Sequence, residues 1–471
     1  MLHPSGILMS SRIPLALLAA GVMSLFALEQ PCARAQDADR EEIRQLREQI
    51  RLLDAKLRKL ERKQEEKERR AVADSPPSVV SADGSGFSME SADKRYRLAL
   101  KALVQVDHRL FLNDKRIRGT ETPVAQNTFL LRRVRPALAG TLGGIFDFTI
   151  VSELGAGDAT SSSARVQDAW ISARLTSTLA IKAGKFTSPI ALEAGTSRHF
   201  IEAPFVNAIL PNRDIGVEFM GTIGDGRVAY RVGGYNGSRN NTADFAEDVD
   251  NGKSIAGRLT FNPFIGTDGG LKGLSLGVGA GVSREEGDPA GTLEDPVTNG
   301  QQTLLSYGSL AADGRHVRIS PSASYYSGPV SLVAEYAWTR QRLLRGATGF
   351  DAKTRAWRAT IGHVLTGEES TPGGVTPRVN FLRGESWGAF EIVVRISGID
   401  FDDDLFAPDA GALPNAPTSI NSTGATAYGT GINWFMSRNL IFLVNYEYTD
   451  FDGSTLRPAE SALFSRAQLR F

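Results

Sequence analysis

Cysteine is nearly absent from this chain, which has Cys32 as the single cysteine among its 471 residues. An internal disulfide and a zinc site made of several cysteines are therefore excluded. Excess charge is absent too, because 53 Lys and Arg balance 53 Asp and Glu. This balance does not point to a nucleic-acid partner or to an acidic disordered chain. The five histidines lack the spacing of metal ligands, and we expect no metal and no cofactor.

Long apolar runs are rare as well, and the one present lies near the N-terminus. Apolar residues 13–28 are followed by Ala33-Arg34-Ala35, which has the small-x-small pattern of a signal peptidase site. We therefore predict a signal peptide over residues 1–35 and a mature chain that starts at Gln36 without Cys32. The run is short for a membrane anchor, and the residues before the cysteine do not resemble a lipoprotein site. No later run reaches about 18 apolar residues, which excludes a helical membrane protein.

Residues 37–71 have the repeat of a coiled coil. Their apolar residues alternate spacings of three and four, which places them at positions a and d of a heptad. A solvated single helix is the alternative, and the pattern does not determine the number of chains. The heptad residues are Ile43, Leu46, Ile50, Leu53, Leu57 and Leu60. We divide the mature chain into a coiled coil (36–71), a linker rich in Pro, Ser and Gly (72–92) and a third domain (93–471).

Beyond the linker the period of the pattern changes to two. From Tyr96 to Leu112 the even positions are mostly apolar and most odd positions are polar. This alternation lasts for about seventeen residues, whereas a soluble sandwich strand usually has about 5 or 6. A tilted strand that crosses a membrane needs about 9–11 residues. The pattern therefore favours a transmembrane β-strand with one face toward lipid and one toward water.

The same pattern recurs to the end of the chain and predicts an all-β membrane protein, an antiparallel transmembrane β-barrel of about sixteen strands. Its connections alternate between short turns and long loops, with 342–353 among the long ones. The connection 367–386 breaks this rule, because it is long on the side of the short turns. The predicted strands are 96–112, 128–142, 145–154, 166–176, 179–187, 213–223, 227–236, 252–262, 272–284, 314–326, 330–341, 354–366, 387–400, 423–435, 439–450 and 462–471.

The last predicted strand ends on an aromatic residue, Phe471. A terminal aromatic on an alternating strand resembles the recognition element of the machinery that assembles outer-membrane barrels. We therefore expect that machinery to be a partner of the chain. An even number of strands would place both barrel ends, and the coiled coil, in the periplasm.

Two motifs typical of enzymes or metal sites do not fit their usual context. Residues 384–388 match G-x-S-x-G, but a strand follows where a nucleophile elbow needs a helix. The acidic run 400–404 lacks EF-hand spacing and is more typical of a solvated loop. We therefore expect no catalytic residues and no enzyme.

Charges on the inward face carry more information about function. More basic than acidic residues face the interior in the predicted register, and rings of arginine favour anions in a pore. Inward charges can equally pair with one another and brace the wall, and both interpretations stay open. We expect Arg133 and Arg135 to face the lumen with Arg198 or Arg213 opposite. Their neighbour Arg132 would then share the lipid side with Leu130, Val134 and Leu138.

Loop 188–212 is the candidate constriction. It is long, and half of it is apolar, from Phe200 through Leu210. An external loop in water has little reason to be so apolar. We therefore expect it to fold back against the barrel wall.

Several segments, in order along the chain, resemble the family of phosphate-selective porins O and P. The resemblance implies a sixteen-stranded trimeric outer-membrane porin whose third loop narrows the pore. It also implies uptake of small anions, such as phosphate, through an arginine ladder and a lysine cluster. The similar segments are 132–135 with 139–142, 183–186 with Pro189 and Glu193, 212–217, 365–368, 387–391 with Arg395, 431–435 and 445–448. The candidate anion-binding residues are Arg133, Arg135, Lys185, Arg198, Arg213, Arg97 and Lys101.

The chain departs from this family in one respect, because loop 188–212 contains no lysine. Three hypotheses follow. The first is a passive channel for small, anionic solutes in the outer-membrane lipid, working as a homotrimer. The second is a structural envelope barrel with a plugged lumen, and the third is a non-selective general diffusion porin.

Overall fold

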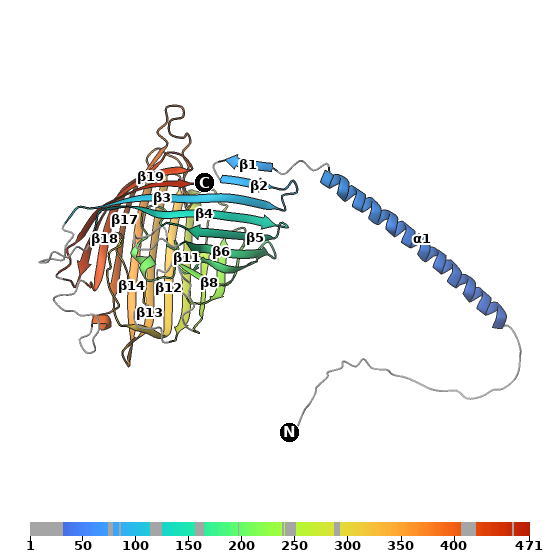
Figure 1. Ribbon diagram of the computed structural model, residues 1–471, viewed down its shortest axis with the longest axis horizontal. Coiled ribbons are helices and arrows are strands. Elements are labelled where there is room, and N and C mark those ends of the chain that lie inside the picture. The colour runs from blue at the N-terminus through green and yellow to red at the C-terminus, as the bar shows by residue number, and fades with distance from the viewer. Residues whose placement is uncertain are drawn as a thin grey trace, which may run out of the picture. The chain divides into compact units, whose positions relative to one another are not determined.

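Sixteen antiparallel strands form a closed barrel in the computed structural model (Figure 1). Each strand pairs with the next one in chain order, and the last pairs with the first to complete the ring. This confirms the predicted architecture. The strands are β3 (Arg97–Phe111), β4 (Thr128–Leu142), β5 (Phe146–Glu153), β6 (Arg165–Arg174), β7 (Ala180–Thr187), β8 (Arg213–Ile223), β9 (Val228–Tyr235), β10 (Ser254–Phe261), β11 (Leu274–Glu285), β12 (Ala311–Ser327), β13 (Val330–Arg345), β14 (Thr348–Val364), β17 (Ala389–Phe401), β18 (Gly424–Phe435), β19 (Leu440–Asp452) and β20 (Glu460–Arg470).

The structure describes most of the chain after its first 31 residues. The predicted signal peptide, 1–35, therefore lies outside the described residues except for its last four. Short 3-10 helices, η1 (Phe205–Ala208), η2 (Gly270–Gly273) and η3 (Asp403–Phe406), lie in the connections. The described residues are 32–73, 79–83, 86–113, 125–155, 164–195, 197–237, 240, 251–286, 293–406, 421–454 and 456–471.

Side chains on the barrel alternate between a buried inner face and an exposed outer face. On β13 the inward residues Val333, Glu335 and Thr339 are each 3% exposed. The outward Leu332 and Tyr336 are 41% and 40% exposed. Because a strand has a period of two, one face stays apolar while the other collects charges. Large apolar residues thus cover the outside of the barrel, which requires an apolar environment around it.

A hairpin precedes the barrel and corrects our expectation of a linker over 72–92. Its strands are β1 (Val79–Asp83) and β2 (Gly86–Glu90), and β2 pairs with the first part of β3. The last strand, β20, pairs with the rest of β3. Strands β2 and β20 therefore follow one another along the same edge of β3. Gly86 has a φ of +106°, and a Cβ there would lie 2.6 Å from the carbonyl oxygen of Leu100. Only glycine fits this junction without strain.

The expected long loop 342–353 is wrong. Strands β13 and β14 continue through it, and their pairing extends to Arg345 opposite Thr348. Alternation continues as well, since Leu343 and Ala352 are buried. Gly346, with a φ of +62°, turns the chain in place of a loop. The unusual connection between β14 and β17 contains a small hairpin of β15 (Ser370–Thr371) and β16 (Gly374–Val375).

The N-terminal unit of the chain contains one long helix, α1 (Cys32–Ala73). It is rich in Leu, Glu, Lys and Arg, which have high helix propensity. No described helix is both long enough and apolar enough to cross a membrane. The heptad residues whose side chains are described are 51% to 65% exposed, and they are Leu46, Ile50, Leu53, Leu57 and Leu60. An apolar stripe is thus free on the helix, and the coiled coil itself stays a prediction.

Gly184 of β7 gives a test of the barrel packing. It has a φ of +128°, and a Cβ would lie 2.2 Å from the carbonyl oxygen of Ala169 on β6. Gly184→Ala should therefore lower the free energy of unfolding by about 1–3 kcal/mol, measured by urea titration in detergent. Gly234→Ala on β9 is the matched control, because a Cβ there meets no atom within 4 Å. Equal stabilities of the two variants would contradict the close approach.

Candidate functional site

Loop 188–212 joins β7 to β8 and lies inside the barrel. Its apolar side chains are buried, with Ile190, Phe200, Phe205 and Ile209 at most 2% exposed. Helix η1 in this loop packs against β13, β14 and β17. The apolar half of the loop thus packs on the inner wall, as its composition predicted.

Polar contacts tie the loop to strands far from its origin. Glu193 forms an ion pair with Arg358 of β14 at 2.6 Å. The backbone N–H of Ile201 donates to Oδ1 of Asn445 on β19 at 2.8 Å. Since the loop begins at β7, these partners show that it crosses the lumen.

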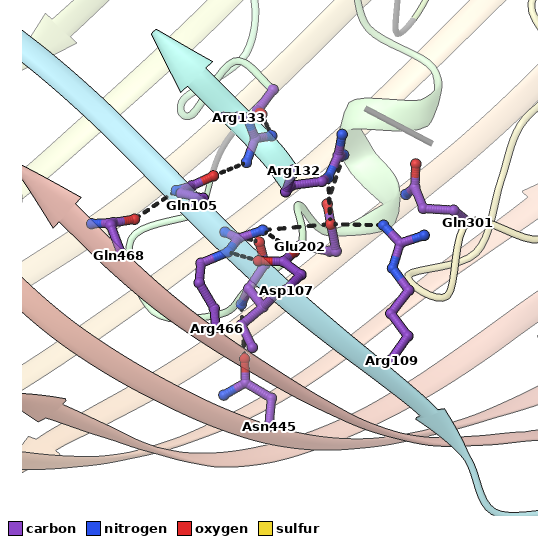
Figure 2. A network of polar contacts seen from close by, with 12 residues as sticks. Gln105, Asp107, Arg109, Arg132, Arg133, Glu202, Gln301, Asn445, Arg466 and Gln468 are labelled. Carbon is purple, nitrogen blue, oxygen red and sulfur yellow. Dashed lines mark hydrogen bonds and ion pairs between the residues drawn. The ribbon is translucent and has the colours of Figure 1, made fainter. Parts of the chain in front are cut away.

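Glu202 also ties the loop to the wall, and three arginines surround it (Figure 2). Its carboxylate lies 2.8 Å from Nε of Arg132, 3.4 Å from Nη2 of Arg109 and 3.6 Å from Nη2 of Arg466. Arg466 also makes two hydrogen bonds to Asp107, at 2.6 and 2.7 Å. Burial alone would raise the pKa of Glu202. The charges of Arg132, Arg466 and Arg109 outweigh this effect and lower the pKa below its usual value, so the carboxyl group stays ionised. This network holds the loop against β3, β4 and β20.

A β-bulge on β4 explains why Arg132 reaches Glu202. The pairing with β3 skips Arg132, because Arg133 and Leu131 face consecutive residues of β3. Arg132 and Arg133 therefore both point inward. In the part of β4 that precedes the bulge, odd-numbered and even-numbered residues exchange faces. Our placement of Arg132 and Leu130 on the lipid side is wrong. Leu130 is buried, whereas Leu131 is 53% exposed.

Arg133 lies on the inner face, 6% exposed, and has neutral partners. Its Nη1 donates to Oε1 of Gln105 at 2.8 Å, and its Nη2 donates to the carbonyl oxygen of Gly195 at 3.2 Å (Figure 2). Gln105 in turn donates to Gln468 at 2.6 Å. Among the described residues Arg133 has no carboxylate partner, so its charge is not cancelled locally.

Three other candidates gather elsewhere on the wall. Arg135 pairs with Glu153 at 2.5 Å, and Arg213 pairs with Asp168 at 3.0 Å. The ammonium group of Lys185 donates to a carbonyl oxygen of β6 at 2.9 Å. Carboxylates thus balance both arginines, which brace the wall between β4 and β8.

Arg198 connects the inner loop to the connection 365–388. It forms an ion pair with Glu391 of β17. It also donates to the carbonyl oxygen of Thr371 at 3.0 Å and to Oγ of Ser370 at 2.7 Å. The β15–β16 hairpin therefore reaches loop 188–212, which explains the length of this connection.

The remaining two candidates, Arg97 and Lys101, lie on the first part of β3. Arg97 is 4.0 Å from Glu90 of β2, with both side chains partly exposed. Lys101 is exposed and forms no ion pair with a described residue. Neither of them reaches loop 188–212.

A cavity of about 490 Å³ lies between loop 188–212, the β15–β16 hairpin and the inner wall. Glu193 is the one acidic residue in its described lining, whereas five arginines line it. The geometry brings together the predicted Arg133 and Arg198 and leaves out Arg135, Lys185, Arg213, Arg97 and Lys101. The lining arginines are Arg133, Arg198, Arg231, Arg466 and Arg470.

Glu202 is not among the residues that the sequence pattern singles out, and Arg470, which alternation along the last strand places inward, is not among the predicted anion-binding residues. Glu202 could have been found as a lone acid inside the apolar half of a loop expected to pack inward. Arg470 donates to the carbonyl oxygen of Gly373 at 3.3 Å, a contact that no pattern in the sequence indicates. No three described His, Cys, Asp or Glu side chains are grouped to hold a metal ion.

Comparison with known proteins identifies the family. Residues 104–471 match the phosphate-selective porin O and P family. The chain belongs to this family. Porin O of Pseudomonas aeruginosa is 23% identical over 393 residues, which are 77% of this chain and 85% of that protein.

Solved structures share the fold of this porin. OmpT of Vibrio cholerae, in its trimer form, has a TM-score of 0.50 at 10% identity, covering 80% of this chain and 99% of that one. OmpF of Salmonella typhi, in complex with daunomycin, has the same TM-score and identity and covers 83% and 100%. Family and fold together make the chain an outer-membrane diffusion porin, whose apolar outer face contacts lipid.

Removal of the Glu202 charge tests the anchoring of the loop. Glu202→Gln leaves the buried Arg109 and Arg466 and the partly buried Arg132 with less negative charge around them, so the free energy of unfolding should fall by about 3–5 kcal/mol. Urea titration would measure this loss, and limited proteolysis should then cleave within loop 188–212. Glu369→Gln, at an exposed position, is the control and should change neither. A loop that stays protected in Glu202→Gln would show that its apolar packing is sufficient.

Proposed function

We propose that this porin conducts small anions and that the basic cavity under loop 188–212 is the selective part of the path. The supporting observation is the five arginines against one glutamate in the cavity lining. Arginine stays charged and offers several donors, so a group of them can replace water around a passing anion. Binding must stay weak, or the anion would not leave.

Arg133 and Arg470 contribute most to this selectivity in our proposal. Glu391, Glu218 and Asp107 balance Arg198, Arg231 and Arg466. The contacts of Arg133 and Arg470 with described residues are to neutral acceptors. An uncancelled charge attracts an anion more strongly than a paired one.

Phosphate is the anion that we propose first. Its support is the family and the likeness to Porin O, while the lack of lysine in loop 188–212 speaks against a strong preference. Millimolar inorganic phosphate should reduce the chloride current if phosphate binds in the cavity. No reduction would leave a general anion channel.

A barrel with a plugged lumen is the second candidate function. The observation that favours it is the number of segments inside the barrel, since residues 297–305 enter it beside loop 188–212. Oγ1 of Thr298 donates to Glu460 of β20 at 2.8 Å, and Leu304 is fully buried. The conductance of the purified protein in a planar bilayer distinguishes a channel from a plugged barrel, because a plugged barrel would carry no steady current.

The N-terminal part and the assembly of the porin are also proposals. We infer a cleaved signal peptide over 1–35, a coiled coil of 36–71 in the periplasm and a homotrimer. The support for three chains is the family together with the trimer form of OmpT. The aromatic side chain of Phe471 supports the proposal that the barrel assembly machinery recognises this residue. Phe471 lies where the barrel closes, and its N–H donates to the carbonyl oxygen of Ala102 at 3.1 Å.

Single substitutions of Arg133 and Arg135 separate a selective arginine from a bracing one. A unit charge about 6 Å from an ion in a watery pore contributes about 0.7 kcal/mol. Loss of the charge in Arg133→Ala disfavours chloride and favours potassium by this amount each, so the chloride-to-potassium permeability ratio should fall about tenfold, measured as the reversal potential in a KCl gradient. Arg135→Ala should change the ratio less, because Arg135 does not line the cavity.

Arg133→Lys is the control for charge, and it should retain the anion preference of the unmodified channel. An unchanged permeability ratio in Arg133→Ala would overturn the proposed role. A greater loss of anion preference in Arg135→Ala would instead assign selectivity to the group of Arg135, Lys185 and Arg213 on the wall.

Two neighbouring leucines test the coiled coil. The mature chain has no other cysteine, so Leu46→Cys, at a heptad position, should form disulfide-linked chains on oxidation if the helices associate. Leu53→Asp in this background should abolish the link, because it puts a charge into the apolar seam. Leu52→Asp is the control, since Leu52 is comparably exposed, at 58% against 65%, but lies off the seam. Non-reducing gels measure the product, and loss in both variants would contradict the heptad register.

A further inference from the structure

A basic cluster lies on the outside of the barrel, on the strands β11 to β14. These strands are neighbours in the barrel (Figure 1). Its side chains point outward, because they alternate with buried residues such as Ser283, His316 and Gln341. They lie at the ends of the strands that are remote from the barrel's first and last residues. The members of the cluster are Arg284, Arg315, Arg340, Arg342, Lys353 and Arg355, all exposed.

The register places like charges directly opposite one another in this cluster. Arg284 faces Arg315 across β11 and β12, and Arg340 faces Lys353 across β13 and β14. Side chains in such positions have Cβ atoms about 4.5–5.5 Å apart, and like charges there destabilise a sheet. Two such pairs on adjacent hairpins are unfavourable unless negative charge lies over them.

The acidic residues nearby balance part of the cluster. Asp351 is 2.7 Å from Arg340 and 3.9 Å from Arg342. Glu286 is 4.0 Å from Arg284. Arg315, Lys353 and Arg355 form no side-chain ion pair with any residue that the structure describes. Asp400 faces Arg355 across β14 and β17, and the carboxylate of Asp402 accepts a hydrogen bond from the backbone N–H of Lys353 at 2.8 Å.

An apolar and aromatic belt lies directly below the basic cluster on the same strands. Trp338 faces Arg355, and Tyr336 faces Trp357 one step further toward the other end. Ile319 of β12 is 40% exposed at the same level. Aromatic residues mark the boundary between hydrocarbon and headgroups, and cations just beyond them reach headgroup phosphates. The cluster is thus at the height of the lipid headgroups.

The cluster does not continue onto β4, β6 and β8. On β4, β6 and β8 the outward residues nearest the same end are Phe129, Val166 and Ile215. A uniform band of cations would indicate general attraction to the membrane surface. A cluster on four adjacent strands instead resembles a site for one molecule.

We propose that this surface binds a lipid of the outer leaflet whose headgroup carries two or more phosphates. Arginine pairs with phosphate oxygens through two parallel hydrogen bonds, and the aromatic belt contacts the acyl chains. The bound phosphates offset the repulsion of the two like-charge pairs. This inference uses the membrane location of the barrel and is independent of the solute that passes through its lumen.

Native mass spectrometry of the detergent-purified full chain tests the proposal, with bis-phosphorylated lipid A as the probe. The variant is Arg315→Ser with Lys353→Ser and Arg355→Ser. Each basic residue at an anionic lipid surface contributes about fivefold in affinity, so lipid binding should weaken about a hundredfold. Lys94→Ser with Arg95→Ser and Lys272→Ser removes three exposed cations at the other end of the barrel and should bind lipid A normally.

Further measurements make each outcome decisive. Heat-modifiable migration on gels shows that the variant is folded, and Arg315→Lys with Arg355→Lys should retain lipid binding. Dephosphorylated lipid A should bind weakly, and millimolar inorganic phosphate should not displace the intact lipid. The proposal is overturned if the variant binds lipid A normally, if inorganic phosphate competes equally, or if the variant changes the number of chains in the complex instead.

Single-channel conductance keeps this test separate from the test of solute selectivity. The substituted side chains lie outside the barrel, so the conductance and reversal potential of the folded variant should stay unchanged. A change in reversal potential without a change in lipid binding would overturn the proposed lipid site. It would leave the proposed anion path in place.

Discussion

Every backbone N–H and C=O that crosses a hydrocarbon layer needs a partner, and the rest of this structure depends on that constraint. The chain satisfies it by pairing β20 with β3, which leaves no free edge along the spanning part of the barrel. Closure also determines where side chains go, because strands with a period of two must put one set of residues outside and the other inside. The apolar outer face, the charged lumen and the position of loop 188–212 all follow from this closed ring.

The lumen uses its charges in two ways. Most arginines there are paired with carboxylates, as Arg466 is with Asp107 and Arg358 is with Glu335 and Glu193. These pairs hold segments that carry few backbone contacts of their own, above all loop 188–212. A few cations, such as Arg133, instead have neutral partners. Stability and the proposed selectivity can therefore be separated within one network, since the charges paired with carboxylates brace the wall and Arg133 is not among them.

Net neutrality of the sequence conceals a strong separation of charge in space. Arginines gather in the cavity beneath the inner loop and again on the outer rim of β11 to β14, while several acidic residues of the lumen, such as Asp107, Glu202 and Glu335, form ion pairs. The composition, with 53 residues of each sign, gives no hint of either cluster. Only the fold brings residues as distant in sequence as Arg133 and Arg470 to one cavity.

The sequence by itself determined the barrel, because alternation over long strands is a local pattern that hydrocarbon and water enforce residue by residue. It placed β4 at 128–142 and β8 at 213–223, and the apolar half of loop 188–212 indicated that the loop packs inside. Tertiary structure decided what depends on registers and distant partners. The bulge that turns Arg132 inward, the hairpin beside β3 and the reach of the β15–β16 hairpin to Arg198 depend on contacts between remote segments. A period of two cannot reveal such contacts, since one inserted residue reverses the face of every side chain before it.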